Sequence, residues 1–506
     1  MFNITKLSLP YFRHICRREL RAAAEVETTQ RRVLATLIHA ARQTLWGDQH
    51  KYTHITSYEQ YARRVPVTPY SELRPYVMRM ITGEPDILWP GFTRRFAQSS
   101  GTSDGKSKYI PVTPRGLSRN HYAGAAFSLG SYLIHHPGSR LFGGKNFILG
   151  GSYANELNLP PAVKVGDLSA TLIDRINPLV NLVRVPSKEI ALMADWQQKL
   201  PALVNASVNA DIRSISGVPS WFLTVLRTIL QQQGATSIHN IWPNLEVFFH
   251  GGIAFGPYRE QYDRITDPGR MHYWENYNAS EGFFAAQSSP GSDSMHLIVD
   301  ADVFYEFIPV SQPDATPIPA WKVKAGEIYS LLITSSNGLW RFPIGDTVTV
   351  TSVRPLEITI AGRTAHFINA FGEEVMVYNT DAALARACAA TGAEVLNYTA
   401  APVYAGNRTR GRHQWLVEFA TPPASISVFA RILDEALQQE NSDYQAKRSG
   451  GIFLDPLTVT RATPGLFDRW LASTGKLGGQ RKVPRLANDR RFIDPLLKLN
   501  TPINEA

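Results

Sequence analysis

The sequence predicts an α/β protein with a large N-terminal domain, residues 1–360, and a small α+β C-terminal domain, residues 361–506. From about residue 70 to residue 310, helical stretches alternate with short apolar runs, which is typical of sheets flanked by helices. Residues 325–361 alternate apolar and polar side chains between turn residues, which predicts a β-rich subdomain. After residue 361 the strand and helix patterns restart over ~140 residues, as expected for a separate small domain.

The N-terminal region is predicted to be helical. Residues 15–46 are rich in Arg, Glu, Ala and Leu and contain neither Pro nor Gly, and Leu34, Leu37 and Ile38 give them an apolar face. Gly47 is a stop signal, so we expect this helix to end there. A second helical stretch is predicted over residues 71–84.

Short apolar runs predict the strands. The α/β part contains candidates at 146–150 and 245–250, and the β-rich part is expected to contain antiparallel strands at 328–334, 347–351 and 356–360. In the small domain we expect a helix that Thr380 caps and that ends at Gly392. Strands near 394–399 and 414–419 and a helix over 427–439 follow.

Composition excludes several classes of protein. The net charge of +9 on 506 residues is modest and spread out, so we expect no nucleic-acid partner. Two cysteines, Cys16 and Cys388, exclude a disulfide-rich scaffold and indicate a reducing, cytoplasmic location. No apolar run approaches the ~20 residues that span a bilayer, so no membrane partner is expected. The adjacent His135 and His136 indicate a helix end rather than paired zinc ligands.

A loop rich in hydroxyls and glycines is the most informative segment. It reads Ser-Ser-Gly-Thr-Ser-Asp-Gly-Lys-Ser-Lys from Ser99 to Lys108. Glycines allow backbone N–H groups to point inward and hold phosphate oxygens, while hydroxyls and lysines add donors and positive charge. The loop is one residue shorter than the P-loop of nucleoside triphosphatases, and such clusters are also common in surface turns. From these residues alone, a phosphate site and a polar turn both stay open.

A second motif, Tyr277-Asn-Ala-Ser280-Glu281, follows an aromatic-rich stretch that is expected to include a buried strand. An aromatic ring can stack on a base, a hydroxyl can donate to a phosphate, and a carboxylate can hold Mg²⁺. Alternatively, the segment is a strand that ends in a polar loop, with Tyr277 in the core.

A third motif, Arg341-Phe-Pro-Ile-Gly345-Asp346, follows the strand that is predicted to end at Thr334. An acidic residue after a glycine turn can accept the hydroxyls of a ribose. The alternative is a β-turn in which Asp346 accepts from its own backbone.

The order of the three motifs resembles that of adenylate-forming enzymes, and most closely the Gretchen-Hagen-three family of auxin-responsive acyl acid amido synthetases. That family's first motif, Ser-Ser-Gly-Thr-Ser-x-Gly-x-x-Lys, is present from Ser99 to Lys108. Its second and third motifs are similar to Tyr277–Glu281 and Arg341–Asp346. Further likenesses occur at 305–309, 362–363, 371–374 and 479–485, so the resemblance spans residues 70–490.

The resemblance implies an adenylate-forming fold and an ATP-dependent ligase. A carboxylate would attack the α-phosphate of Mg·ATP and give an acyl-adenylate and pyrophosphate. An amine, usually that of an amino acid, would then take the acyl group and release AMP. The site must gather two anions and neutralise the charge that builds on phosphorus. Rotation of the small domain about Gly362-Arg363 would separate the two half-reactions.

The same likeness assigns the phosphate and metal contacts. Glu281 would hold Mg²⁺, and Lys482 would approach the α-phosphate during adenylation as a point charge. The ATP phosphates would be bound by Ser99, Ser100, Gly101, Thr102, Ser103, Gly105 and Lys108.

The nucleoside contacts follow in the same way. Tyr277 would stack on adenine, Ser280 would contact the α-phosphate, and Asp346 would bind the ribose. Gly251 and Gly252 would lie beside the base, where the alternative is a glycine turn next to an incidental histidine, His250.

Two departures from the family pattern leave these chemical groups intact. Asn278-Ala279 stands where the family often has Gly-Ser, and Trp340-Arg-Phe-Pro343 replaces a Tyr-Arg pair. The rival interpretations are an acyl-CoA ligase that uses the same adenylate, a P-loop ATPase or kinase, and a non-catalytic nucleotide- or acyl-binding protein.

The substrates beyond ATP are small molecules, a carboxylic acid and an amine, and we expect a monomer. The acid pocket is expected to draw on residues 115–235, where Arg115 and Arg140 are candidates that the sequence does not rank.

Overall fold

The chain is divided into two units of unequal size. The first holds the described residues up to Ile360 except residues 255–263, which include most of α13 (Gly256–Ile265). Those residues belong to the second unit, together with the residues from Ala361 onward. The structure is a computed structural model, and it describes residues 4–99, 108–155, 157–252, 255–363, 367–368, 370, 373, 375–403, 411–441, 444–445, 448, 454–474, 483–487 and 489–500.

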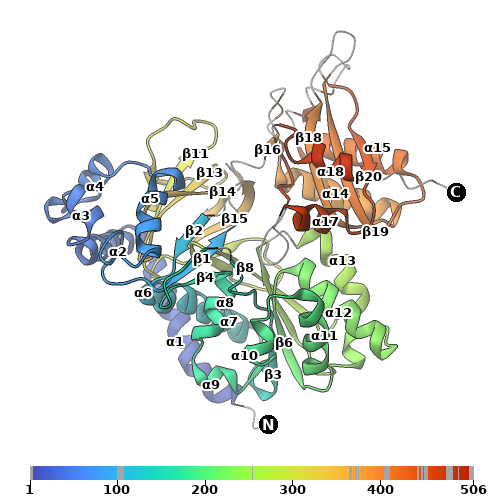
Figure 1. The fold of residues 1–506 in the computed structure, drawn as a ribbon, viewed down its shortest axis with the longest axis horizontal. Helices are drawn as coiled ribbons and strands as arrows, with labels where there is room; N and C mark the ends of the chain where they lie inside the picture. Colours follow the sequence, from blue (N-terminus) through green and yellow to red (C-terminus); the bar gives the residue numbers. More distant parts are fainter. Residues whose placement is uncertain are drawn as a thin grey trace. The chain divides into compact units, whose positions relative to one another are not determined.

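In the described part of the first unit, a twelve-stranded sheet has the order β12-β11-β13-β14-β15-β10-β9-β8-β7-β6-β3-β5 (Figure 1). Neighbours from β5 to β8 are parallel, and β8 pairs antiparallel with β9. The strands are β3 (Lys145–Ile148), β5 (Arg184–Val185), β6 (Ile212–Gly217), β7 (Val247–Gly251), β8 (His272–Ala279), β9 (Gly282–Gln287), β10 (Met295–Leu297), β11 (Val303–Pro309), β12 (Ile318–Pro319), β13 (Ile328–Ser335), β14 (Leu339–Val353) and β15 (Leu356–Arg363).

Helices cover both faces of the parallel half of this sheet. Successive side chains of β7 point to opposite faces, so Phe249 packs against Tyr132 of α7 while Phe248 packs against Phe222 of α12. The helix α1 lies along α7. The helices of this unit are α1 (Thr5–Ala24), α2 (Val26–Ala41), α3 (Leu45–Gln49), α4 (Tyr58–Arg64), α5 (Tyr70–Ile81), α6 (Pro114–Gly116), α7 (Tyr122–His135), α8 (Leu168–Arg175), α9 (Pro178–Asn181), α10 (Lys188–Ala191), α11 (Trp196–Ser207) and α12 (Pro219–Gln233).

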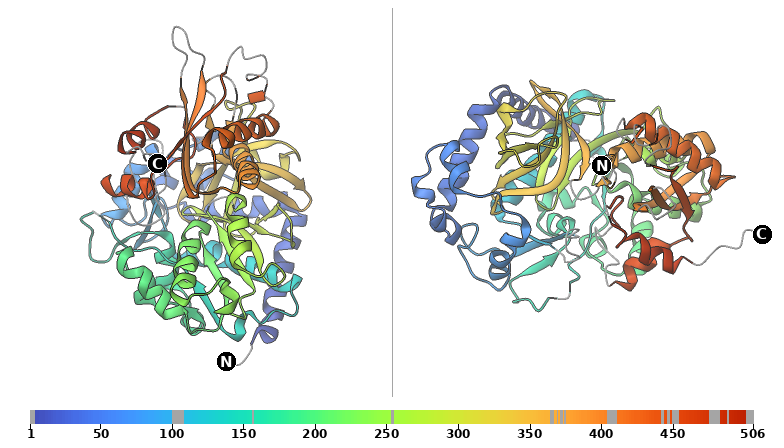
Figure 2. Two further views of the ribbon diagram at one scale, coloured as in Figure 1. Left: turned by 90° about the vertical axis from the view of Figure 1, so that its right-hand side faces the viewer. Right: turned by 90° about the horizontal axis from the view of Figure 1, so that it is seen from above.

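The N-terminal helices are anchored on a segment far along the chain. The Glu19 carboxylate of α1 accepts from the Val299 N–H at 2.7 Å, and the Gln30 amide of α2 donates to the Val299 carbonyl at 2.8 Å. Gln30 also accepts from the Tyr305 N–H at 2.8 Å. The Gln30 bonds hold α2 beside β11, and α2 contacts β13 as well, while Glu19 ties α1 to Val299, which precedes β11 (Figures 1 and 2).

The predicted single helix over 15–46 is wrong. The structure has two helices, α1 and α2, separated at Glu25, whose backbone is not helical (φ −126°, ψ 58°). Because both helices are anchored on residues 299–305, tertiary contacts override a sequence without breakers. The predicted stop at Gly47 is also wrong, since α2 ends at Ala41 and Gly47 lies within α3.

The predicted strands are confirmed with shifted ends. Strands β3, β7, β13 and β15 overlap the strands predicted at 146–150, 245–250, 328–334 and 356–360. The strand predicted at 347–351 is much longer, since β14 extends from Leu339 to Val353 and includes the whole third motif. The helix predicted over 71–84 is confirmed as α5, which ends at Ile81.

A smaller sheet carries the hydroxyl-rich loop. Its order is β2-β1-β4, formed by β1 (Arg95–Ser99), β2 (Lys108–Pro111) and β4 (Lys164–Gly166). β1 and β2 are antiparallel, and Ser99 lies opposite Lys108. The loop is therefore held at both ends by one hairpin ladder.

In the second unit, helices pack on a sheet of order β18-β19-β20. The predicted alternation is confirmed, but Thr380 is not a cap, because α14 begins at Val377 and Thr380 lies within it. Gly392 ends α14 in a left-handed conformation as expected. The elements are β16 (Phe367–Ile368), β17 (Val375–Met376), α14 (Val377–Thr391), β18 (Glu394–Val403), β19 (Arg412–Thr421), α15 (Ile426–Glu440), β20 (Thr458–Arg461), α17 (Leu466–Ser473) and α18 (Ile493–Leu499).

Across the described ranges, the helices are all too short or too polar to cross a membrane.

Candidate functional site

The carboxyl ends of β7 and β8 form the edge where the second motif lies. In parallel sheets, ligands bind outside the carboxyl ends of the strands. Gly251 ends β7 opposite Asn276 of β8, and a Cβ on Gly251 would lie 2.3 Å from the Asn276 carbonyl oxygen. Gly252 follows with a φ of +80°, which favours glycine. Close backbone packing therefore accounts for Gly251, and a positive φ accounts for Gly252.

A hydrogen bond joins the second motif to the third. The Tyr277 hydroxyl donates to the Asp346 carboxylate at 2.7 Å. Both side chains are buried, at 4% and 5% exposure, and the Tyr277 ring packs on Phe284 with centroids 5.1 Å apart. Asp346 lies within β14 rather than in the predicted turn, so the strand itself holds the carboxylate beside Tyr277. The structure thus brings together two motifs 69 residues apart.

Asn337, which the sequence did not single out, connects three segments. It is 1% exposed, accepts from the Thr113 N–H after β2 at 3.1 Å, and donates to the Glu281 carbonyl at 3.3 Å. A Cβ on Gly116 would lie 1.9 Å from the Asn337 Oδ1, so glycine is required there. The available signal was Asn337-Gly338 between two strands, which is a hairpin turn sequence.

Ser280 and Glu281 occupy the tight connection from β8 to β9, and both are buried. The connection is held from the other side by Asn120, whose amide accepts from the Phe283 N–H at 2.7 Å and donates to the Phe283 carbonyl at 2.9 Å. On β8 itself, burial and the nearby Asp293 raise the pKa of Glu275 to about 7. The backbone that carries Ser280 and Glu281 is therefore held from two sides, by Asn120 and Asn337.

Arg341 of the third motif is part of the core. Its guanidinium makes two 2.8 Å bonds to the Glu306 carboxylate of β11 and donates to the carbonyls of Ala62 and Val65. Its backbone has a φ of 44°, and the Tyr58 hydroxyl also donates to Glu306. A single carboxylate in the apolar run 303–309 was the sequence signal for a buried cation partner. Arg341 therefore fixes β14, which carries Asp346.

The remaining predicted residues are distributed as follows. Lys108 lies at the start of β2, with its amine 5.9 Å from the centre of the Phe342 ring of β14. Arg115 is paired with Asp302, and Arg140 lies at the opposite edge of the sheet, so the two do not meet. The residues outside the described ranges are Ser100, Gly101, Thr102, Ser103, Gly105 and Lys482, and the side chains of Ser99 and Arg363.

The chain matches three family models in sequence order. They are the GH3 family N-terminal domain at residues 17–154 and 138–271, the GH3 family central domain at residues 296–363, and the GH3 family C-terminal domain at residues 378–491.

Named relatives match over almost the whole chain. Indole-3-acetic acid-amido synthetase GH3.8 of Oryza sativa subsp. indica is 23% identical over 91% of this chain and 88% of its own length. Indole-3-acetic acid-amido synthetase GH3.3 of Arabidopsis thaliana is 22% identical, over 94% and 91%.

Solved structures share the fold. The AtGH3.15 acyl acid amido synthetase in complex with 2,4-DB has a TM-score of 0.79 at 18% identity and covers 96% of each chain. A 2-hydroxyisobutyryl-CoA ligase in the postadenylation state has a TM-score of 0.59 at 14% identity, covering 92% of this chain and 91% of that one. The predicted fold, a large α/β domain followed by a small α+β domain, is confirmed.

Proposed function

Because this chain belongs to the GH3 family, we propose that it activates a carboxylic acid with ATP and transfers the acyl group to the amine of an amino acid. Enzymes of this family are ATP-dependent, adenylate-forming ligases. An acid oxygen attacks the α-phosphorus, the bond to pyrophosphate breaks, and the amine nitrogen later attacks the acyl carbon and displaces AMP. The observation that carries the proposal is the buried Tyr277–Asp346 bond at the carboxyl edge.

The described residues suit the nucleoside end of ATP. Asp346 is fixed by β14, which Arg341 and Glu306 tie to the core, so its carboxylate can accept ribose hydroxyls without reorganisation. Gly251 and Gly252, at the end of β7 beside β8, would lie against the base, and Tyr277 would stack on it. Ser280, in the connection that follows β8, would contact the α-phosphate.

The phosphate end would use the loop between β1 and β2. We propose that Ser99, Ser100, Gly101, Thr102, Ser103, Gly105 and Lys108 hold the β- and γ-phosphates, and that Lys482 approaches the α-phosphate from the small domain. The ladder between Ser99 and Lys108 would fix both ends of the loop.

Glu281 would hold Mg²⁺. Magnesium in nucleotide sites takes one or two carboxylates together with substrate phosphates, so the single buried carboxylate of Glu281 fits this ion. When bound, Mg²⁺ would neutralise charge on the phosphates. The residues of this chain would orient the acid, exclude water from the adenylate and keep Glu281 in place through Asn337.

The decisive experiment is acid-dependent ATP–pyrophosphate exchange across a panel of carboxylic acids. Glu281→Ala and Asp346→Ala should each abolish exchange, while Asp314→Ala, at an exposed acid in a surface loop, should retain it. Circular dichroism checks that each variant is folded. Retained exchange in both site variants would overturn the site assignment, and absence of exchange in the wild type with every acid would favour a non-catalytic binding protein.

The acceptor is tested separately. Adenylate formed in place is offered either a mixture of amino acids or coenzyme A, and the products are identified by mass spectrometry. An amide product supports the amido synthetase, whereas a thioester would assign the chain to acyl-CoA ligation. Lys482→Ala should slow adenylation more than aminolysis of a pre-made adenylate, and equal slowing of both would contradict its proposed place at the α-phosphate.

A further inference from the structure

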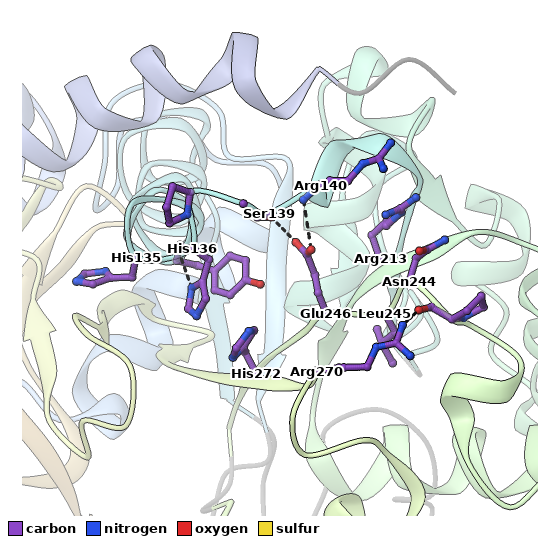
Figure 3. Close-up of a pocket in the computed structure, with 14 residues that line it drawn as sticks. His135, His136, Ser139, Arg140, Arg213, Asn244, Leu245, Glu246, Arg270 and His272 are labelled. Carbon is purple, nitrogen blue, oxygen red and sulfur yellow. Dashed lines mark hydrogen bonds between the residues drawn. The ribbon is translucent and has the colours of Figure 1, made fainter.

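A cavity lies at the edge of the twelve-stranded sheet opposite the proposed ATP site, where β6, β7 and β8 begin. Its volume is about 530 Å³, within the range of small-molecule sites. Its walls are the end of α7 with the loop that follows, and the first residues of the three strands (Figure 3). The cavity is separate from the proposed ATP site, because the five residues of β7 lie between the two edges.

Three arginines from different elements line this cavity. Arg140 follows α7, Arg213 lies at the start of β6, and Arg270 precedes β8. Asp211 neutralises Arg213 at 2.8 Å, and Arg270 donates to the Pro243 carbonyl. Within the described residues, the guanidinium groups of Arg140 and Arg270 make no ion pair. Arg140 and Arg270 therefore carry two positive charges that no described carboxylate pairs directly.

Of the described residues that line the cavity, only Glu246 carries a carboxylate, and it is already engaged. It accepts from the Ser139 hydroxyl and, at 3.3 Å, from the Arg140 backbone N–H. Its charge is thus directed at the loop after α7 rather than at the guanidinium groups. Figure 3 shows Glu246 between the two halves of the cavity, with Arg213 and Arg270 on one side.

Histidines line the other half of the cavity. The rings of His136 and His272 lie 4.1 Å apart between centroids, and His136 stacks on Tyr132. Burial, and for His272 the neighbouring His136, lower the pKa of both rings, so they are neutral without a ligand. His135 and Glu246 are the other titratable groups that act on His136. A negative charge placed among these groups would favour protonation of the rings.

We propose that this cavity is a binding site for a small oxyanion that carries two or more negative charges, held by Arg140 and Arg270 and, through proton uptake, by the histidine pair. Arginine suits this role because its planar fork donates two parallel bonds to phosphate or carboxylate oxygens. The site is independent of the proposed synthetase reaction.

The test is titration calorimetry at low ionic strength, with inorganic phosphate and citrate as separate probes. We expect saturable binding of at least one probe. Arg140→Gln and Arg270→Gln should each weaken it about tenfold or more, because each removes a charge-assisted contact. Arg63→Gln, at an exposed arginine of α4, is the matched control and should bind like the wild type. The probe that binds more tightly shows whether the site prefers a phosphate or a polycarboxylate ligand.

Two further measurements separate this site from the ATP site. Glu281→Ala should bind the probe like the wild type. If this variant loses ATP–pyrophosphate exchange but still binds the probe, the proposed oxyanion site is supported independently of the ATP site. Binding heats measured near neutral pH in two buffers of different ionisation enthalpy should differ in the wild type and converge in His272→Gln. Absence of saturable heat with both probes, or equal affinity in the wild type, Arg140→Gln and Arg270→Gln, would overturn the proposal.

Discussion

The two edges of strands β6, β7 and β8 are built in contrasting ways. At the carboxyl edge, backbone and side chains are in close contact: Gly251 approaches the Asn276 carbonyl, and the buried Tyr277 hydroxyl donates to Asp346. At the amino edge the side chains stand around an open cavity, where Ser139 donates to Glu246. The same strands therefore hold one edge rigid and leave the other open, so equivalent changes at the two edges should have unequal effects.

The largest contrast is expected in catalysis. Asp346→Asn keeps the shape of the side chain but removes the charge that the proposed ribose contact needs, so kcat/KM for ATP should fall by ~10²-fold. Asp211→Asn, the same change at the amino edge, should leave kcat/KM unchanged. Steady-state pyrophosphate release at varied ATP measures both, and equal losses would show that the two edges are not functionally distinct.

The next largest difference is expected between the two hydroxyl–carboxylate hydrogen bonds, Tyr277–Asp346 at the carboxyl edge and Ser139–Glu246 at the amino edge. Tyr277→Phe leaves a buried charge with one donor fewer, which costs about 1.5–3 kcal/mol of unfolding free energy. Ser139→Ala at the open edge should cost about 1 kcal/mol or less, because water can replace the lost donor. Urea unfolding monitored by tryptophan fluorescence compares them, and a larger loss for Ser139→Ala would reverse the assignment of the rigid edge.

A pair of glycines gives a smaller and sharper test. In Gly251→Ala the new Cβ would meet a backbone oxygen at 2.3 Å, so the strands must shift at a cost of about 1–2 kcal/mol. Gly138→Ala, in the loop beside the cavity, places a Cβ with no heavy atom within 4 Å and should change stability by less than about 0.5 kcal/mol. Thermal unfolding of the two variants side by side measures the difference, and similar midpoints would argue against close packing at Gly251.

The smallest effects concern pH and have opposite signs along β8. The pKa of Glu275 is raised to about 7, so the wild type loses stability as pH rises from about 4.5 to 7. Glu275→Gln should remove that loss, so its unfolding free energy should exceed that of the wild type at pH 8 and differ little from it at pH 4.5.

The pKa of His272 is lowered by burial and by His136, so the wild type loses stability as pH falls below about 6.5. His272→Gln should reduce that loss at pH 5.5 without changing the unfolding free energy at pH 8. Unfolding free energies over pH 4.5–8.5 check both variants, and a shared sign for the two would contradict the environments described for this strand.

Local chemistry accounts for what the sequence could predict. Hydroxyls, glycines and lysines between Ser99 and Lys108, and the order of the two later motifs, were enough to identify the family, and alternation in the apolar runs located the antiparallel strands. The break at Glu25 was out of reach because it depends on anchors near residue 300. Asn337 was missed because its role comes from meeting Thr113 and Glu281 in space.

The cavity at the amino edge was out of reach for the same reason. Arg140, Arg213 and Arg270 are isolated in the sequence and meet only when three parallel strands begin side by side. Asp346 was assigned to a turn because Pro343 and Gly345 flank it closely, yet pairing with β13 holds the segment in a strand. In each case long-range pairing decided the outcome.

The anchoring of α1 and α2 has a consequence for synthesis of the protein. Glu19 and Gln30 are translated about 270–280 residues before their partners at Val299 and Tyr305. At 5–20 residues per second, these anchoring bonds wait roughly 14–56 s before they can form. The face of α2 that packs on β11 and β13 is exposed on the nascent chain during that time, so early aggregation and chaperone capture should involve α2.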